Sequence, residues 1–250
     1  MSTTPASAPP ATDTTTDPRG STAWRAPLTW LAGTVAAADL VFFALIGEVI
    51  SPLAGGIVLT VIGLVALRRA PRAGIVVLGL TSLIMLGGNL GFAIDHLSHP
   101  ASAIDFTHAA IGSAGRALAL VAAIGAWRGA SAPGARRLVV VSIGLAGITV
   151  VTAAVAMITS AGDDLATGDV QVAVADAAFP TSIEAAAGDV LFIDNQDLFR
   201  HTFTVTGTGV DVELPASVGV RVPLDLDAGV YEVTCEVPGH DFMTTTLELG

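Results

Sequence analysis

Two patterns of hydrophobic and polar positions divide this chain of 250 residues. The first part contains five long apolar stretches, at about residues 28–49, 52–68, 74–94, 104–127 and 137–160. Each is long enough, or nearly so, to cross a hydrocarbon core of about 30 Å as an α-helix, and the second is the shortest. The first part is therefore predicted to be an all-α transmembrane bundle of five helices.

Short alternating segments replace the long apolar runs beyond Gly168. Gly, Pro, Asp and Asn separate them at intervals of roughly 8–14 residues, which is typical of strands joined by turns. Six strands are predicted, at residues 170–174, 189–193, 201–205, 218–222, 230–235 and 244–249. They indicate an antiparallel β-sandwich of about 85 residues. The chain is therefore expected to be a multi-domain protein.

The polar segments give the expected domain boundaries. Residues 1–23 are rich in Thr, Ser, Pro and Ala and poor in large apolar residues, which predicts a disordered tail. The transmembrane domain is expected over residues 24–160, a short polar linker over 161–168, and the β domain over 169–250. The first apolar run starts too late and continues too long for a cleaved secretory signal, so we expect an uncleaved anchor.

Composition and arginine placement support this division and predict an orientation. The chain is 52% hydrophobic and 13% charged, with a mean hydropathy of +0.71, which is too apolar for an ordinary soluble protein. Apart from Arg116, the arginines of this part precede the first span or lie in alternate loops, at Arg19, Arg25, Arg68, Arg69, Arg72, Arg128, Arg136 and Arg137. The positive-inside rule then predicts a multi-pass plasma-membrane protein with a cytoplasmic tail and an extracytoplasmic β domain.

Acidic residues are concentrated in the C-terminal part. From Gly168 onward there are 14 acidic residues and two arginines, a net charge of −12, whereas the whole chain has a net charge of −11. Such a domain favours a protein partner with a basic docking face and predicts salt-sensitive docking. The lipid bilayer is the other expected partner, and no nucleic acid is expected.

One short segment carries the residue types of a copper site. Cys235 is the only cysteine, His240 follows five residues later, and Met243 three residues after that. A thiolate, an imidazole and a thioether suit copper, and a blue-copper site needs a second histidine. His201 can supply it, because strand alternation turns both His201 and Cys235 toward the core. Zinc is the competing metal, although a thioether offers zinc little.

The region from about residue 168 to residue 250 resembles the cupredoxins, the small blue copper domains of the plastocyanin and azurin type. Residues 179–183, Phe-Pro-Thr-Ser-Ile, and 188–192, Gly-Asp-Val-Leu-Phe, are similar to the early strands of that family. Asn195, shortly before His201-Thr-Phe, is similar to the usual approach to the first histidine ligand. No family resemblance is identified for the membrane part.

The ligand loop strengthens the resemblance. The spacing of Cys235 and His240 with a Pro-Gly-His turn resembles azurin, whereas the two residues between His240 and Met243 resemble amicyanin. The resemblance implies His201, Cys235 and His240 as equatorial ligands of one type 1 copper, with Met243 as the weak axial ligand. It also implies that electrons pass through the exposed edge of His240, with Pro238 and Phe242 as an apolar docking patch.

The function expected from this resemblance is a membrane-anchored carrier of single electrons at the outer face of the membrane, and enzymatic activity is left open. Membrane redox complexes or cytochromes are the expected partners. Two alternatives remain open, namely copper handling or delivery, and a copper-dependent membrane oxidoreductase with a second metal site.

Polar residues within and beside the spans are the remaining candidates for function. Asp39 and Arg116 lie near the middle of spans one and four, where an unpaired charge costs roughly 2.5–3.5 kcal/mol, so an ion pair that fixes helix packing is predicted. A proton or ligand path is the alternative. The outer loop and the start of span four could hold a second metal, through Asp95, His96, His99, Asp105 and His108. A polar interfacial loop is the simpler interpretation, and haem is weakly supported because no two spans each offer a histidine.

Overall fold

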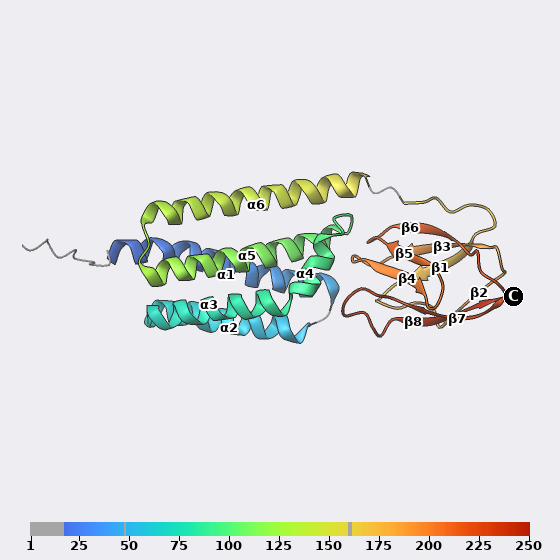
Figure 1. Ribbon diagram of the computed structural model, residues 1–250, viewed down its shortest axis with the longest axis horizontal. Helices are drawn as coiled ribbons and strands as arrows, with labels where there is room; N and C mark the ends of the chain where they lie inside the picture. The colour runs from blue at the N-terminus through green and yellow to red at the C-terminus, as the bar shows by residue number, and fades with distance from the viewer. Residues whose placement is uncertain (1–17, 48, 160–161) are drawn as a thin grey trace, which may run out of the picture.

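A computed structural model places residues 18–47, 49–159 and 162–250 in six helices, eight strands and the segments between them. The helices lie side by side in an elongated bundle, and the β domain lies beyond one end of that bundle (Figure 1). The predicted order, an all-α part followed by a two-sheet β domain, is therefore confirmed.

Five of the helices are long and apolar enough to cross a membrane, as predicted. They are α1 (Pro18–Ile46), α2 (Ser51–Arg69), α3 (Pro71–Gly88), α5 (Ala103–Arg128) and α6 (Ala132–Thr159). Large apolar side chains such as Ile143 and Ile158 are 68% and 84% exposed on the protein alone. An apolar surface of this extent is typical of a protein surrounded by lipid.

Helix α1 begins earlier than the sequence suggests. Residues 18–23, predicted to belong to a disordered tail, are helical, while residues 1–17 lie outside the described residues. Trp24 anchors this end of the helix, because its indole packs where Gly125 and Gly134 leave room and its Nε1 donates to the Ala130 carbonyl at 3.0 Å. A Cβ added at either glycine would lie within 3 Å of the indole ring.

The third predicted span, 74–94, is broken in the structure. Helix α3 ends at Gly88, and a separate short helix, α4 (Leu90–Leu97), follows Asn89. The Asn89 side chain donates to the Met85 carbonyl at 2.7 Å and so competes with the backbone for the last turn of α3. The break places α4 at the end of the bundle next to the β domain (Figure 1).

The β domain consists of two sheets with the strand orders β1-β3-β6 and β2-β8-β7-β4-β5. The strands are β1 (Val170–Val174), β2 (Ser182–Ala185), β3 (Val190–Asn195), β4 (His201–Val205), β5 (Asp211–Leu214), β6 (Gly219–Pro223), β7 (Gly229–Thr234) and β8 (Thr244–Leu249). The six predicted strands are present, and β2 and β5 are additional. Most pairs are antiparallel, but β1 pairs with β3 and β2 pairs with β8 in parallel.

The predicted linker is attached to the β domain over its described residues. The backbone N–H of Asp163 donates to the Gly219 carbonyl at 2.9 Å, and the Asp163 carboxylate accepts from the Arg221 backbone at 2.7 Å. Arg221 also forms a two-pronged pair with Asp169, with both contacts at 2.8 Å. Residues 162–168 therefore run along β6, which shortens the free connection between the β domain and α6.

Candidate metal centre

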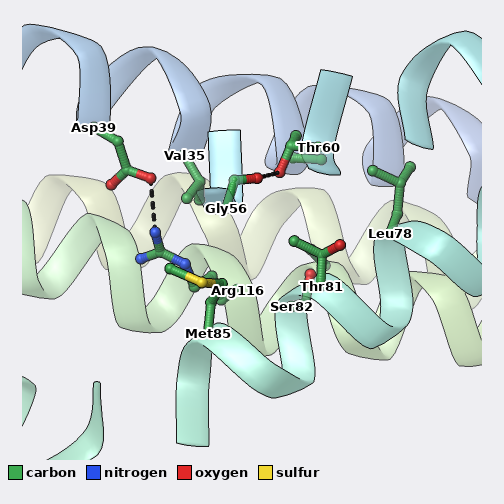
Figure 2. Close-up of a pocket in the computed structure, with 11 residues that line it drawn as sticks. Val35, Asp39, Gly56, Thr60, Leu78, Thr81, Ser82, Met85 and Arg116 are labelled. Atoms are coloured by element: carbon green, nitrogen blue, oxygen red, sulfur yellow. Dashed lines mark hydrogen bonds and ion pairs between the residues drawn. The ribbon is translucent and has the colours of Figure 1, made fainter. Parts of the chain in front are cut away.

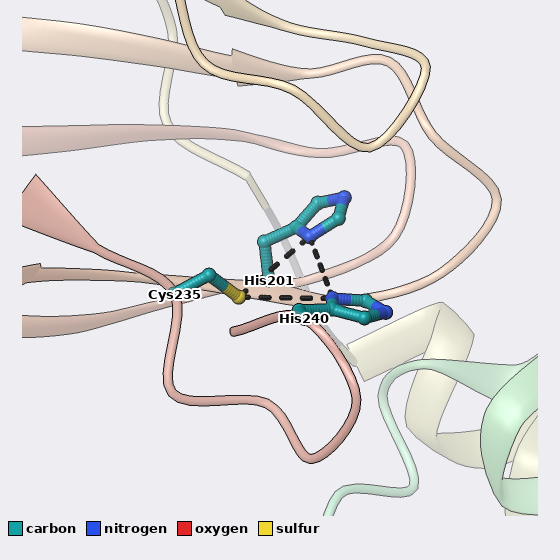
Figure 3. Close-up of side chains that lie close together, drawn as sticks. All are labelled: His201, Cys235 and His240. Atoms are coloured by element: carbon teal, nitrogen blue, oxygen red, sulfur yellow. Dashed lines mark hydrogen bonds between the residues drawn. The ribbon is translucent and has the colours of Figure 1, made fainter. Parts of the chain in front are cut away.

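Three metal-ligating side chains converge at one end of the β domain (Figure 3). His201 Nδ1 lies 3.2 Å from His240 Nδ1, and Cys235 Sγ lies 3.8 Å from the former and 3.7 Å from the latter. A point equidistant from these three atoms is about 2.1 Å from each, which matches the distances of about 2.0–2.3 Å at which imidazole nitrogen and thiolate sulfur bind a first-row metal. The donor set and its spacing therefore fit one soft transition-metal ion.

The strands position the first two ligands. His201 opens β4 and is fully buried, and Cys235 follows the last residue of β7 and is 3% exposed. Strands β4 and β7 are paired, with Val205 opposite Val233, so both ligands point from adjacent strands into the same core. The inward orientation predicted from strand alternation is what the structure shows.

A tight loop returns the chain to the site. Gly239 has a φ of +91°, a left-handed conformation that a side chain strains, and the His240 N–H donates to the Val237 carbonyl at 2.9 Å. The Cys235 N–H then donates to the Met243 carbonyl at 3.1 Å, which fastens Met243 beside the cysteine. Met243 is 2% exposed and belongs to the same hydrophobic core cluster as Cys235, so a soft thioether side chain lies in the core beside the cysteine.

Hydrogen bonds from neighbouring residues orient the ligands. His201 Nε2 lies 2.8 Å from the Asp197 carboxylate, which leaves Nδ1 as the nitrogen that faces Cys235 and His240. The Thr202 N–H donates to Cys235 Sγ at 3.4 Å, and such a bond stabilises a thiolate. Asn195 is fully buried, and its side-chain amide nitrogen donates to the carbonyls of Phe199, Leu214 and Pro215. These hydrogen bonds join the loop before β4 to the end of β5.

Burial sets the protonation states of the ligands. Desolvation, followed by the charges of His201 and Arg200, lowers the pKa of His240 to about 4. Desolvation also lowers the pKa of His201, partly opposed by Asp197, and raises the pKa of the Cys235 thiol. Both imidazoles are thus neutral near pH 7 and ready to bind a metal, whereas the thiol must lose its proton when the metal enters.

Arg200 connects the metal centre to the helical bundle. Its guanidinium is 2% exposed and pairs with Glu213 at 2.9 Å and with Asp95 of α4, while its backbone N–H donates to the Asp105 carboxylate of α5 at 3.0 Å. His99 Nε2 adds a contact to Glu213 at 3.1 Å. Because Arg200 directly precedes the ligand His201, this network holds the ligand end of the β domain against the bundle.

The five residues considered for a second metal do not converge on one point. Asp95, His99 and Asp105 belong to the network around Arg200, His108 faces Asp39, and His96 has no hydrogen-bond partner within the described ranges. Among the residues that the structure describes, His201, Cys235 and His240 form the one group of three or more such donors that could hold a metal.

The ion pair expected between Asp39 and Arg116 is present. Arg116 Nη2 donates to Asp39 Oδ2 at 2.7 Å, and the two side chains point toward each other from α1 and α5 (Figure 2). Asp39 Oδ1 also lies 3.0 Å from His108 Nε2, and His108 was not predicted from the sequence as a partner of Asp39. Gly112 makes the arrangement possible, because a Cβ there would lie 2.6 Å from Arg116 Nη1.

Sequence reasoning missed Asp197, Arg200 and Glu213. Arg200 did carry a signal, because it is one of only two arginines in an acidic domain and stands next to a predicted ligand. Asp197 precedes His201 by four residues on an irregular loop, and no periodicity indicated which carboxylate would reach the imidazole.

No family model matches the sequence, and no curated protein matches it. Solved structures similar to part of the chain include a reduced mutant amicyanin, at 17% identity over 36% of this chain and 90% of that one, with a TM-score of 0.31. Another is a purple cupredoxin from Nitrosopumilus maritimus, at 15% identity over 33% of this chain and 100% of that one, with a TM-score of 0.28. A third is a heme-copper terminal oxidase dimer, at 18% identity over 47% of this chain and 97% of the matched chain, with a TM-score of 0.28.

These likenesses are distant, so the interpretation of the site rests on the geometry of the donor atoms. The protein combines five helices of membrane-spanning length with a C-terminal β domain of two sheets. In that domain His201, Cys235 and His240 converge and Met243 is buried beside Cys235, a set of side chains typical of type 1 copper.

Proposed function

We propose that this protein is a membrane-anchored electron carrier whose C-terminal domain binds one type 1 copper. His201, Cys235 and His240 are the equatorial ligands and Met243 is the weak axial ligand. The observation that carries the proposal is the triangle of two imidazole nitrogens and one sulfur with sides of 3.2, 3.7 and 3.8 Å. A copper ion held there supplies a one-electron couple between Cu(II) and Cu(I).

The rigidity of the ligands favours electron transfer over copper delivery. His201, Cys235 and Met243 are each at most 3% exposed, and Asp197, Thr202 and the loop hydrogen bonds restrain them. Ligands held in place by a packed core keep one geometry in both oxidation states, and they release a metal slowly. A delivery protein would instead need ligands that reach an acceptor.

The edge of His240 is the proposed route for electrons. His240 is half-buried, and Phe242 beside it is 64% exposed, with ring centroids 6.2 Å apart. This apolar patch, on a domain whose net charge is −12 from residue 168 onward, suits a membrane redox complex or a cytochrome with a basic docking face.

The arrangement of the helices supports an extracytoplasmic position for the β domain. The arginine-rich connections between α2 and α3 and between α5 and α6 lie at the end of the bundle away from the β domain (Figure 1). By the positive-inside rule that end is cytoplasmic. The start of α1 then lies on the cytoplasmic side of a multi-pass plasma-membrane protein.

The proposal is tested by adding Cu(II) to the purified full-length protein and recording visible and EPR spectra. The expected result is an intense blue band with narrow copper hyperfine splitting, both lost in Cys235→Ser. His99→Ala is the matched control, because it changes a neighbouring histidine that does not contact the centre. A pale spectrum with broad splitting, unchanged in Cys235→Ser, would contradict the type 1 assignment.

Copper transfer to a metal-free acceptor distinguishes the carrier from a delivery protein. We expect the copper to remain bound through repeated cycles of oxidation and reduction. Rapid loss of the blue band to the acceptor would favour copper delivery instead. If the protein catalyses a redox reaction that His96→Ala abolishes while the blue spectrum stays unchanged, the alternative of a membrane oxidoreductase with a second metal site would be favoured.

A further inference from the structure

A cavity lies inside the bundle, between the start of α2, helix α4 and the first half of α5. Its volume is about 80 Å³, whereas the cavity on the other side of the Asp39–Arg116 pair has about 10 Å³ (Figure 2). About 10–15 Å³ is needed for one water molecule, so the smaller cavity holds a single water at most. Only the larger of the two has room for part of an organic ligand.

The larger cavity is lined by both apolar and polar residues. Ile50, Leu53, Phe92 and Ala93 supply apolar surface, and Asn89, His108, Ser113 and Arg116 supply polar side chains. Leu90 and Ile94, on the outer side of α4, are 54% and 60% exposed, so this part of the bundle presents apolar side chains to its surroundings. A ligand that reaches such a cavity from the bilayer must be soluble in hydrocarbon and carry a polar group at one end.

His108 determines what that polar group must be. Its side chain is 8% exposed, Nε2 faces the Asp39 carboxylate at 3.0 Å, and Nδ1 has no hydrogen-bond partner within the described part of the chain. The Asp39 carboxylate, which is paired with Arg116, accepts from Nε2, and in the neutral imidazole Nδ1 is then an acceptor. An unpartnered acceptor on a residue that lines the cavity favours a ligand that donates, such as a phenolic hydroxyl.

The surroundings of His108 also favour an aromatic ligand. Phe42 stacks on the imidazole with ring centroids 3.9 Å apart and planes inclined by 4°, which fixes the orientation of Nδ1. Phe92 lines the cavity and offers an aromatic ring. A flat ligand ring beside such a side chain gains stacking energy in addition to burial.

Helix α4 connects the cavity to the β domain. The Phe92 ring meets the buried His96 ring edge-on, with centroids 3.9 Å apart. Desolvation lowers the pKa of His96 to about 4, and the charges of Arg200 and His240 in the β domain contribute to the same lowering. His96 thus lies within electrostatic reach of the proposed metal ligand His240, one helical turn from the cavity wall.

We propose that this cavity binds the ring of a lipid-soluble hydroquinone. One hydroxyl of the ligand donates to His108 Nδ1, and Ser113 and Arg116 line the same cavity. The isoprenoid or alkyl tail extends into the bilayer past α4. Binding does not require copper. The service of this hydroquinone as an electron source for the β domain rests on the proposed function. Its oxidation to the quinone releases two protons and two electrons, and a copper ion in the β domain, reoxidised by its partner after each transfer, would accept the electrons one at a time.

The experiment measures binding to metal-free, full-length protein in nanodiscs of synthetic lipid that contains no quinone. The probe is a decyl-substituted benzohydroquinone kept reduced under anaerobic conditions, and decylbenzene, which lacks both oxygens, is the matched control ligand. We expect saturable binding of the hydroquinone at one site and about 5- to 150-fold weaker binding of decylbenzene, since an unpaired buried acceptor is worth about 1–3 kcal/mol.

Three variants locate the site. His108→Gln keeps a donor toward Asp39 but has no acceptor at the position of Nδ1, because its amide oxygen is bonded to the same carbon as the donor nitrogen. Ala93→Leu fills part of the cavity. Each should weaken hydroquinone binding about tenfold. Ala154→Leu makes the same enlargement on the exposed side of α6 and should bind like the unaltered protein. If His108→Gln fails to fold, Ala93→Leu still decides the location.

Equal affinity for decylbenzene, absence of saturable binding, or unaltered affinity in Ala93→Leu would overturn the proposal. The copper spectrum is recorded on separate samples of the same preparations. A normal blue spectrum without hydroquinone binding would remove this inference alone, and hydroquinone binding without a blue spectrum would remove only the proposed function.

Discussion

The Asp39–Arg116 pair allows a quantitative test of how the bundle is held together. Asp39 is 2% exposed, with Oδ2 at 2.7 Å from Arg116 and Oδ1 at 3.0 Å from His108. Arg116→Leu leaves a buried carboxylate without its charged partner, a change that costs about 3–5 kcal/mol. Removing both charges in Asp39→Leu/Arg116→Leu leaves mainly His108 Nε2 unpaired, at about 1–3 kcal/mol. The double variant should therefore be about 2 kcal/mol more stable than the single variant.

Tryptophan fluorescence reports on the bundle alone, because Trp24, Trp30 and Trp127 all lie in α1 or α5. Unfolding of the full-length protein by increasing SDS in mixed micelles gives the free energy for each variant. Arg136→Leu is the control, because it removes an exposed arginine and should change stability by less than about 0.5 kcal/mol.

Two results would refute the reasoning. If Arg116→Leu costs less than about 1 kcal/mol, then Asp39 does not depend on a charged partner. If the double variant is as unstable as the single variant or worse, the coupling between the two residues has the wrong sign for a buried ion pair.

Four further outcomes are expected. Asp197→Asn should weaken copper binding about 10- to 100-fold in a competition titration, because the first histidine ligand loses its orienting carboxylate. Gly239→Ala, at a φ of +91°, should lower the free energy of unfolding by about 1–3 kcal/mol and broaden the copper EPR signal. Gly207→Ala, at a φ of +77° in another turn, should lower stability by about the same amount and leave the EPR signal unchanged. The pKa of His96 is about 4 in the folded protein and 6.5 in the unfolded chain, so the folded state binds fewer protons between these pH values. The free energy of unfolding should therefore fall by up to about 3 kcal/mol as the pH drops from 6.5 to 4. Denaturant unfolding of His96→Phe should show a weaker dependence of stability on pH. Electron exchange with a basic cytochrome should slow as ionic strength rises, and an unchanged rate would exclude steering by the net charge of −12.

Features that depend on local pattern could be predicted from the sequence. The five spans follow from the lengths of the apolar runs, and the inward direction of His201 and Cys235 follows from the period of two in a strand. The pairing of Asp39 with Arg116 follows from the cost of an isolated charge in a membrane. In each case the information lies in neighbouring residues or in a strong general penalty.

Features that depend on the meeting of distant segments required the tertiary structure. Asn89 broke the third span because its side chain competed with a backbone bond, and β2 became a strand because it found β8 as a parallel partner. The roles of Arg200 and His108 were decided in the same way. Arg200 joins a β-strand ligand to carboxylates about a hundred positions earlier. His108 Nε2 contacts Asp39, and its Nδ1 has no hydrogen-bond partner among the described residues. Sequence spacing carries no record of such contacts, since the folded packing of helices and sheets alone brings these side chains within bonding distance.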